Sequence, residues 1–237
     1  MPESRLKVTL LASTPDAEAV CAAAARTCYS AMHTDELAAL VHTKDQTVFL
    51  RRIVASGHLS VLEHASFTFA VEGVSRVLLA QLTRHRIASF SVQSQRYVSL
   101  GEGFDYIIPP RIRGLGEEAV AEYRSQMETA HSWYRAWQEK LGENANEDAR
   151  FVLPAACETR LTLTMNCREL LHFFSLRCCS RAQWEIRALA DAMLSLCKKA
   201  APALFETAGP SCVSGPCPEG AKSCGRAAEM REKYAKL

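Results

Sequence analysis

Two segments that alternate polar and apolar residues, far apart in the chain, constrain the fold most strongly. SFTFAVEG (residues 66–73) places Phe67, Phe69 and Val71 on one face, and TRLTLTMN (residues 159–166) alternates in the same way. Such alternation is typical of a strand that is buried on one side. The segments between and around them do not follow a regular βαβ spacing, which favours α+β over a doubly wound sheet. We therefore predict one domain at residues 1–210 with a central, mainly antiparallel sheet and flanking helices.

Capping residues and helix-terminating residues indicate where the predicted helices begin and end. They cover residues 14–29, 45–56, 74–83, 116–141, 167–178 and 181–205. Thr14 is expected to cap the first helix, and Gly57 to end the second. The apolar anchors of the long fourth helix are expected to be Tyr123, Trp133, Tyr134 and Trp137. Residues 101–114, which include two prolines, are the best candidate for a flexible loop.

Composition places the chain among ordinary globular proteins. Of its 237 residues, 48% are hydrophobic and 23% charged. The sequence contains no apolar run of about 18 residues and no signal-peptide stretch, so we expect a cytoplasmic protein with no membrane partner. Its ten cysteines are then expected to be thiols rather than disulfides. Cys212, Cys217 and Cys224, in the tail at 211–237, form no C-x-x-C pair, so an irregular tail is favoured over a zinc site and no metal is predicted.

Uncompensated positive charge is concentrated in RHRIASFSVQSQRY, residues 84–97. The stretch contains no acidic residue, in a chain whose net charge is only +2. Arg84, Arg86 and Arg96 can form bidentate, charge-assisted bonds to phosphate, although a solvated basic face is the alternative. A Walker loop is absent, and two aromatic residues are few for a nucleic-acid surface. The pattern favours a small phosphorylated molecule and no nucleic acid.

Three further polar clusters accompany this stretch: GHLSVLEH (57–64), DARFVLP (148–154) and NCRELLHFFSLR (166–177). In the last, Arg168 and His172 share a helix face, and Arg177 lies about half a turn out of phase with Arg168. One helix thus offers polar groups to two neighbours. Taken singly, each cluster is also compatible with ordinary exposed or hydrogen-bonded residues.

Together the clusters resemble the flavin-dependent thymidylate synthases. Arg84-His85-Arg86 followed by seven residues and Ser94 looks like the signature of that family, and Gln95-Arg96-Tyr97 extends the match. The segments GHLSVLEH and ARFVLP, and the stretch from Asn166 through Arg177 to QWEI (183–186), are similar to its other blocks and occur in the same order. The likeness runs from about residue 26 to residue 205. Val92 stands where Gln or Glu is frequent, and Cys28 where some relatives have serine.

The resemblance implies a reductive methylation of dUMP to dTMP. Methylenetetrahydrofolate supplies the carbon, FAD reduced by NADPH supplies the hydride, and no cysteine acts as nucleophile. It also implies a homotetramer. The dUMP-binding positions are then Gln81, Arg84, Gln93, Ser94, Gln95, Arg96, Arg150 and Arg177. The FAD-binding positions are His58, Ser60, Glu63, Arg84, His85, Arg86, Ile87, Asn166, Arg168 and His172. Catalytic roles are expected for Arg177, Ser94 and His58, with Arg177 stabilising negative charge on the pyrimidine.

The sequence leaves two alternative functions open. One is a different flavoprotein that acts on a pyrimidine nucleotide without folate, and the other is a non-catalytic protein with an RNA-binding surface. The sequence contains no Rossmann fingerprint, so FAD must be bound by residues particular to the family.

Overall fold

The computed structural model describes residues 1–237, which form two compact units. The first unit comprises Met1–Lys7, Val71–Arg84 and Phe90–Thr162. The second comprises Val8–Ala70, His85–Ser89 and Leu163–Leu237. The division into a domain at 1–210 and a tail at 211–237 stays a prediction, and the structure places residues 211–237 in the second unit.

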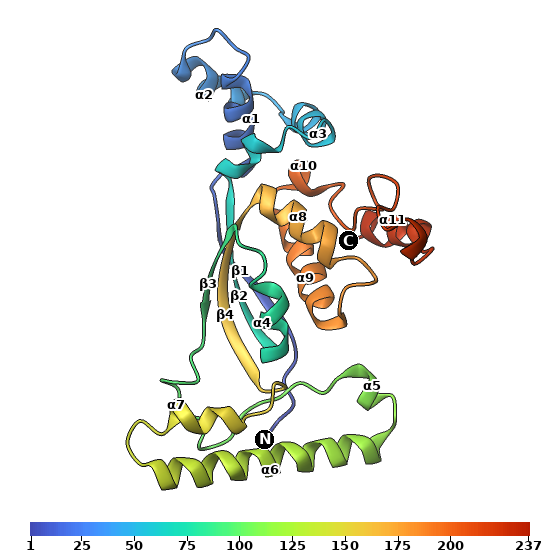
Figure 1. Ribbon diagram of the computed structural model, residues 1–237. Coiled ribbons are helices and arrows are strands. Elements are labelled where there is room, and N and C mark those ends of the chain that lie inside the picture. Colours follow the sequence, from blue (N-terminus) through green and yellow to red (C-terminus); the bar gives the residue numbers. More distant parts are fainter. The chain divides into compact units, whose positions relative to one another are not determined.

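A four-stranded sheet contains both predicted strands as its central pair (Figure 1). Its order is β1 (Lys7–Ser13), β2 (Ser66–Ser75), β4 (Glu158–Asn166) and β3 (Ala88–Val92). The hydroxyls of Thr68 and Thr164 lie 2.9 Å apart, and the amide of Cys167 donates to the carbonyl of Ala65. Residue numbers therefore rise along β2 as they fall along β4, which is antiparallel pairing. The predicted α+β class with an antiparallel sheet is confirmed.

The central strands form where the alternation is strongest. Phe67 and Phe69 are fully buried in β2, and Leu163 is fully buried in β4, while the intervening side chains are more exposed. The outer strands β1 and β3 were not predicted. Their alternating side chains are only half-buried, so the contrast between their two faces is weak.

The helices follow the prediction over most of the chain. They are α1 (Ala17–Thr27), α2 (Thr34–Thr43), α3 (Thr47–Ala55), α4 (Arg76–Leu82), α5 (Pro110–Arg113), α6 (Glu117–Leu141), α7 (Asn146–Ala149), α8 (Cys167–Arg177), α9 (Trp184–Ala200), α10 (Pro202–Phe205) and α11 (Ala227–Ala235). Short 3-10 helices are η1 (Leu59–His64), η2 (Arg150–Val152) and η3 (Gly220–Lys222). Helices α2, α5, α7 and α11 were not predicted, and α5 lies within the stretch 101–114 that was predicted as a loop. None of the helices combines the length and apolar character needed to cross a membrane.

Two helix ends differ from the prediction. Thr14 does not cap α1; its hydroxyl accepts a hydrogen bond from the Ser66 amide at 2.9 Å, and Asp16 occupies the cap position without a side-chain bond. Thr14 therefore ties the end of β1 to the start of β2. The single helix predicted at 181–205 is wrong, because Pro202 lacks the amide hydrogen that a continuing helix needs and begins α10 instead. Gly57 follows α3 with a φ of 77°, as predicted.

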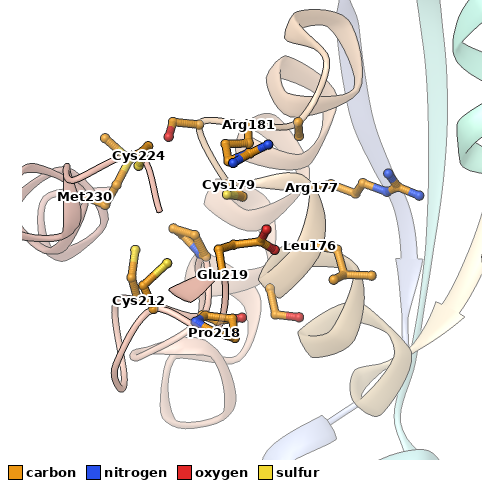
Figure 2. Close-up of a pocket in the computed structure, with 15 residues that line it drawn as sticks. Leu176, Arg177, Cys179, Arg181, Cys212, Pro218, Glu219, Cys224 and Met230 are labelled. Atoms are coloured by element: carbon orange, nitrogen blue, oxygen red, sulfur yellow. The ribbon is translucent and has the colours of Figure 1, made fainter. Parts of the chain in front are cut away.

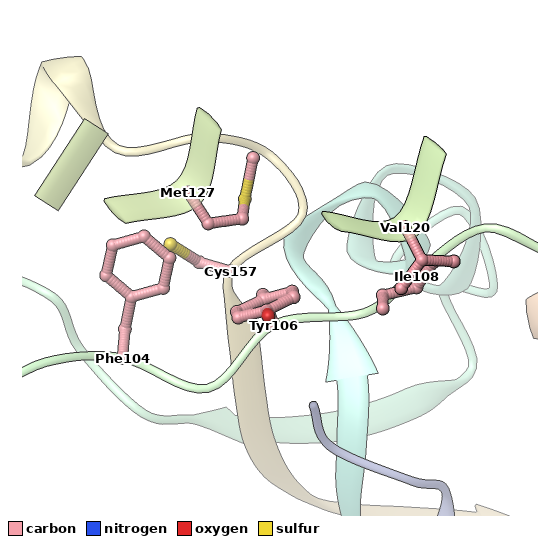
Figure 3. Close-up of a cluster of buried hydrophobic side chains, with 6 residues drawn as sticks. All are labelled: Phe104, Tyr106, Ile108, Val120, Met127 and Cys157. Atoms are coloured by element: carbon pink, nitrogen blue, oxygen red, sulfur yellow. The ribbon is translucent and has the colours of Figure 1, made fainter. Parts of the chain in front are cut away.

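The core of the first unit is packed against the long helix α6. Val120 and Met127 of α6 pack in one buried cluster (Figure 3) with Phe104, Tyr106, Ile108 and Cys157. Residues 104–108 are therefore part of a core, and the prediction of a flexible loop across 101–114 is wrong for them. Tyr134 is an anchor as predicted, but Trp133 and Trp137 are 57% and 45% exposed and are not.

The second unit has an aromatic core that fixes α8. Phe67 meets Phe205 edge to face with ring centres 5.5 Å apart, and Phe174 approaches Phe205 at 6.1 Å. Phe173 is also fully buried. Because both phenylalanines of α8 point inward, the remaining faces of this helix present its polar residues to the cavity described next.

Candidate active site

A cavity of about 650 Å³ in the second unit collects several residues assigned to FAD. It is lined by Leu59, Glu63, Ile87, Asn166, Arg168, Glu169, Leu171, His172 and Ser175. Most of these come from α8, whose start is fixed because the Asn166 side chain accepts a hydrogen bond from the Glu169 amide at 2.9 Å. Arg168 forms an ion pair with Glu63, which links α8 to η1.

The lining of this cavity fits a flavin. Leu59, Ile87 and Leu171 offer apolar surface, while Asn166 and His172 offer hydrogen-bonding groups. Ile87 is 67% exposed, although it is a large aliphatic side chain, so it has surface available for a ligand. Such a combination suits a planar ring system with apolar faces and a polar edge. Five of the assigned residues do not line the cavity: His58, Ser60, Arg84 and Arg86 are exposed, and His85 is buried.

His85 differs from the other residues assigned to FAD because both of its ring nitrogens have protein partners. Nδ1 lies 2.8 Å from a carboxylate oxygen of Glu169, and Nε2 lies 3.0 Å from Nε of Arg177. The ring is only 5% exposed, and its burial lowers the pKa of His85 below the ordinary value. Sequence reasoning missed Glu169. The signal was an acidic residue four positions before Phe173, on the apolar face of the helix.

In the first unit, Glu147 brings together two arginines that were assigned to dUMP. Its carboxylate accepts from Nε of Arg96 at 3.0 Å, and its backbone carbonyl accepts from Nε of Arg150 at 2.9 Å. The Arg96 guanidinium also lies over the ring of Tyr97. The Ser94 hydroxyl accepts from the Arg96 amide at 3.2 Å, so it supports the turn that presents this arginine.

A third arginine, Arg76, belongs to this group and was missed from the sequence. It begins α4 and donates to the carbonyl of Gln93 at 3.3 Å, which connects it to another residue assigned to dUMP. Burial and the nearby positive charge of Arg150 lower the pKa of Arg76. Adjacent guanidinium groups repel one another, and a phosphate between them would remove that cost. Gln81 and Gln95 are half-buried in the same unit.

A second cavity, of about 260 Å³, lies at the other end of α8 (Figure 2). Cys179 lines it together with the three tail cysteines, so the structure supplies a fourth cysteine that the tail sequence lacks. No group of three or more His, Cys, Asp or Glu side chains is arranged to hold a metal ion. Arg177 lines this cavity with its stem, while its guanidinium points away from Cys179 and Cys212 in Figure 2.

Comparison with known proteins assigns the chain to a family. Residues 9–203 match the family model described as Thymidylate synthase complementing protein. The chain is 52% identical to the flavin-dependent thymidylate synthase of Geobacter sulfurreducens, over 98% of this chain and 99% of that one. It is 49% identical to the enzyme of the same name from Clostridium tetani, over 97% of both chains.

A solved structure agrees with this match. The crystal structure of the UMP/dUMP methylase PolB from Streptomyces cacaoi, bound with 5-Br dUMP, is similar with a TM-score of 0.74. The two share 26% identity over 86% of this chain and 94% of PolB. The chain therefore belongs to the thymidylate synthase complementing protein family. Within that family, the relatives that match over nearly full length are named flavin-dependent thymidylate synthases, which confirms the resemblance drawn from the motifs.

Proposed function

We propose that the protein is a flavin-dependent thymidylate synthase, which methylates dUMP to dTMP with methylenetetrahydrofolate as carbon donor and with FAD and NADPH. The observation that carries this proposal is the identity of about half, over nearly the full length, to relatives of that name. The likeness to PolB, named as a UMP/dUMP methylase, supports a pyrimidine nucleotide as substrate. A cytoplasmic location stays a prediction.

The cavity of the second unit is the proposed FAD site. Asn166, Arg168 and His172 would bind polar groups of the flavin, and Leu59, Ile87 and Leu171 its apolar faces. His58, Ser60, Glu63, Arg84, His85 and Arg86 complete the proposed set. When bound and reduced, FAD supplies the hydride of the reaction.

The arginines of the first unit are the proposed phosphate-binding group. Arg76, Arg96 and Arg150 lie around Glu147 and Gln93, and each can donate to phosphate oxygens. Gln81, Arg84, Gln93, Ser94 and Gln95 provide the remaining proposed contacts with dUMP. Arg177 is the proposed electrostatic catalyst, because a fixed guanidinium stabilises negative charge that develops on the pyrimidine ring.

Three buried cysteines, Cys157, Cys178 and Cys197, are poorly suited to nucleophilic attack. Burial raises the pKa of Cys157 to about 12 and raises the pKa of Cys178 and of Cys197 above the ordinary value. These thiols are therefore protonated at neutral pH, and a protonated thiol is a weak nucleophile. This supports a methylation that proceeds without a covalent cysteine adduct.

Two arginine variants test which ligand each cluster binds, because one should weaken FAD binding and the other dUMP binding. Arg168→Ala removes a charge from the FAD cavity, so FAD should bind more weakly while dUMP affinity changes little. Arg96→Ala should weaken dUMP binding by about 1.5 to 3 kcal/mol through loss of a charge-assisted bond, with FAD affinity retained. Titrations that follow flavin absorbance and the heat of dUMP binding measure both affinities. Wild-type protein that takes up no FAD, or variants that weaken both ligands equally, would contradict the assignment.

We further propose a homotetramer whose active sites combine residues from more than one chain. Trp133, Trp137 and Leu141 follow one another at four-residue spacing on α6, and all three are strongly exposed. Such an apolar stripe supports association between subunits. Mass in solution should be four times 26.2 kDa. Co-expression of His58→Ala with Arg177→Ala should restore activity in mixed oligomers, whereas a fully active monomer would contradict the proposal.

A further inference from the structure

A chain of hydrogen bonds in the second unit joins Glu169, His85 and Arg177. Glu169 and His85 are 6% and 5% exposed, so the bond between them is shielded from water. Glu169 stands in the first turn of α8 and Arg177 in its last turn. His85, from the segment before β3, bridges the two ends of the helix with its two ring nitrogens.

The chemistry of Arg177 determines where the protons lie. A guanidinium can only donate hydrogen bonds, so Nε2 of His85 must be the acceptor. A neutral imidazole carries one proton, which is then on Nδ1 and is donated to the Glu169 carboxylate at 2.8 Å. Glu169 thus selects the one tautomer of His85 that can receive Arg177.

We propose that Glu169 is a positioning residue that, through His85, fixes the orientation of the Arg177 guanidinium. The inference rests on the proposed role of Arg177 toward dUMP. An arginine side chain carries about 2 kcal/mol of rotamer entropy, and a bond at Nε sets the plane in which its terminal amino groups lie. The cost of ordering Arg177 is therefore met by the fold before the substrate binds.

The chain of bonds has a defined pH sensitivity. Burial is the main cause that lowers the pKa of His85; Arg177 and His172 lower it further, and Glu169 raises it. The neighbours Arg84 and Arg86 in the same segment are exposed. If His85 is protonated, its Nε2–H faces the Nε–H of Arg177, and the bond is lost. Activity should thus persist at neutral pH and fall as the pH drops through the His85 pKa, which lies below the ordinary value for histidine.

A double-mutant cycle on the FAD-bound protein separates this role from a purely structural one. Glu169→Ala should weaken dUMP binding about 10- to 100-fold, since the acceptor for Nδ1–H is lost and His85 no longer sets the plane of the Arg177 guanidinium. In protein that carries Arg177→Ala, the same change should weaken dUMP binding no further. Glu169→Gln retains an acceptor and should stay within about fivefold of wild type in dUMP affinity. Glu169→Gln also removes the charge that raises the His85 pKa. The acid limb of the pH profile of kcat/KM for this variant should therefore move to lower pH.

Glu158→Ala is the matched control. Its carboxylate is also buried and accepts a hydrogen bond, from the Gly73 amide at 2.9 Å, but it belongs to the first unit and to no proposed ligand group. It should lower stability without changing dUMP affinity or the acid limb.

Specific results would overturn the inference. These are additive losses in the cycle, an equal loss of FAD affinity in Glu169→Ala, which would place Glu169 in direct contact with FAD, or an unshifted acid limb in Glu169→Gln. If Glu169→Ala does not fold, the pH profile of Glu169→Gln alone tests the positioning role of Glu169. Wild-type protein that binds neither FAD nor dUMP would refute the proposed function itself, which is a different outcome.

Discussion

Replacing Arg177 by alanine is expected to lower kcat for dTMP formation about 100- to 1000-fold, the range for removal of one preorganised donor at developing charge. Its Nε bond to His85 fixes the guanidinium, so the loss falls on a group that needs no reorganisation during the reaction. Turnover at saturating dUMP measures the effect, and flavin absorbance checks that FAD is still bound. Arg177→Lys should recover little, because an ammonium cannot reproduce the planar set of donors.

Arg187→Ala provides the comparison for Arg177. Arg187 is also a partly buried arginine of the second unit, and it donates to the carbonyl of Ser180 at 2.7 Å. It belongs to no proposed ligand group, so kcat should stay close to that of wild type. A similar loss in both variants would show that Arg177 acts through folding, and near-normal turnover in Arg177→Ala would show that Arg177 has no catalytic role.

The largest effect on stability is expected from Gly73→Ala, at about 3 kcal/mol or more. Gly73 has a φ of +72°, which is strained for alanine, and an added Cβ would lie 1.8 Å from the carbonyl oxygen of Arg5. Because the obstructing atom is backbone, relief requires the chain at Arg5 or at β2 to move. Urea unfolding, followed by circular dichroism, measures the loss in the free energy of unfolding.

Gly57→Ala separates backbone strain from the steric clash. Gly57 has nearly the same φ, +77°, but an added Cβ would meet nothing within 4 Å. Its loss should be limited to the strain, about 1 to 2 kcal/mol. Equal losses for the two variants would show that the approach of Arg5 to Gly73 contributes nothing.

Local patterns were enough to predict the central strands and most helices. The alternation in β2 and β4 reflects one fully buried face, so it is visible in the residues themselves. The outer strands β1 and β3 have no such contrast. In β3, Ala88, Phe90 and Val92 alternate with serines, but none of these side chains is fully buried, so the alternation does not mark a buried face.

The motif residues of the candidate site were predictable, while the residues that hold them were not. Arg168 and His172 line one cavity as their helical spacing indicated. The roles assigned to Arg76 and Glu169 depend on partners distant in sequence. Arg76 lies near Arg150, and Glu169 bonds to His85. No periodicity along the chain encodes such pairs. Trp133 and Trp137 were expected to be buried because they are aromatic, but both are exposed. Aromatic character alone therefore does not indicate which face of α6 is buried.

We propose that this chain couples flavin oxidation to methylation of dUMP. An anaerobic single-turnover experiment tests it most directly: protein reduced with NADPH is mixed with methylenetetrahydrofolate and dUMP, and both flavin absorbance and nucleotide products are followed. We expect dTMP to appear in step with flavin reoxidation, and only when both substrates are present. Flavin that reoxidises with dUMP alone, dTMP formed without flavin oxidation, or no dTMP at all would contradict it.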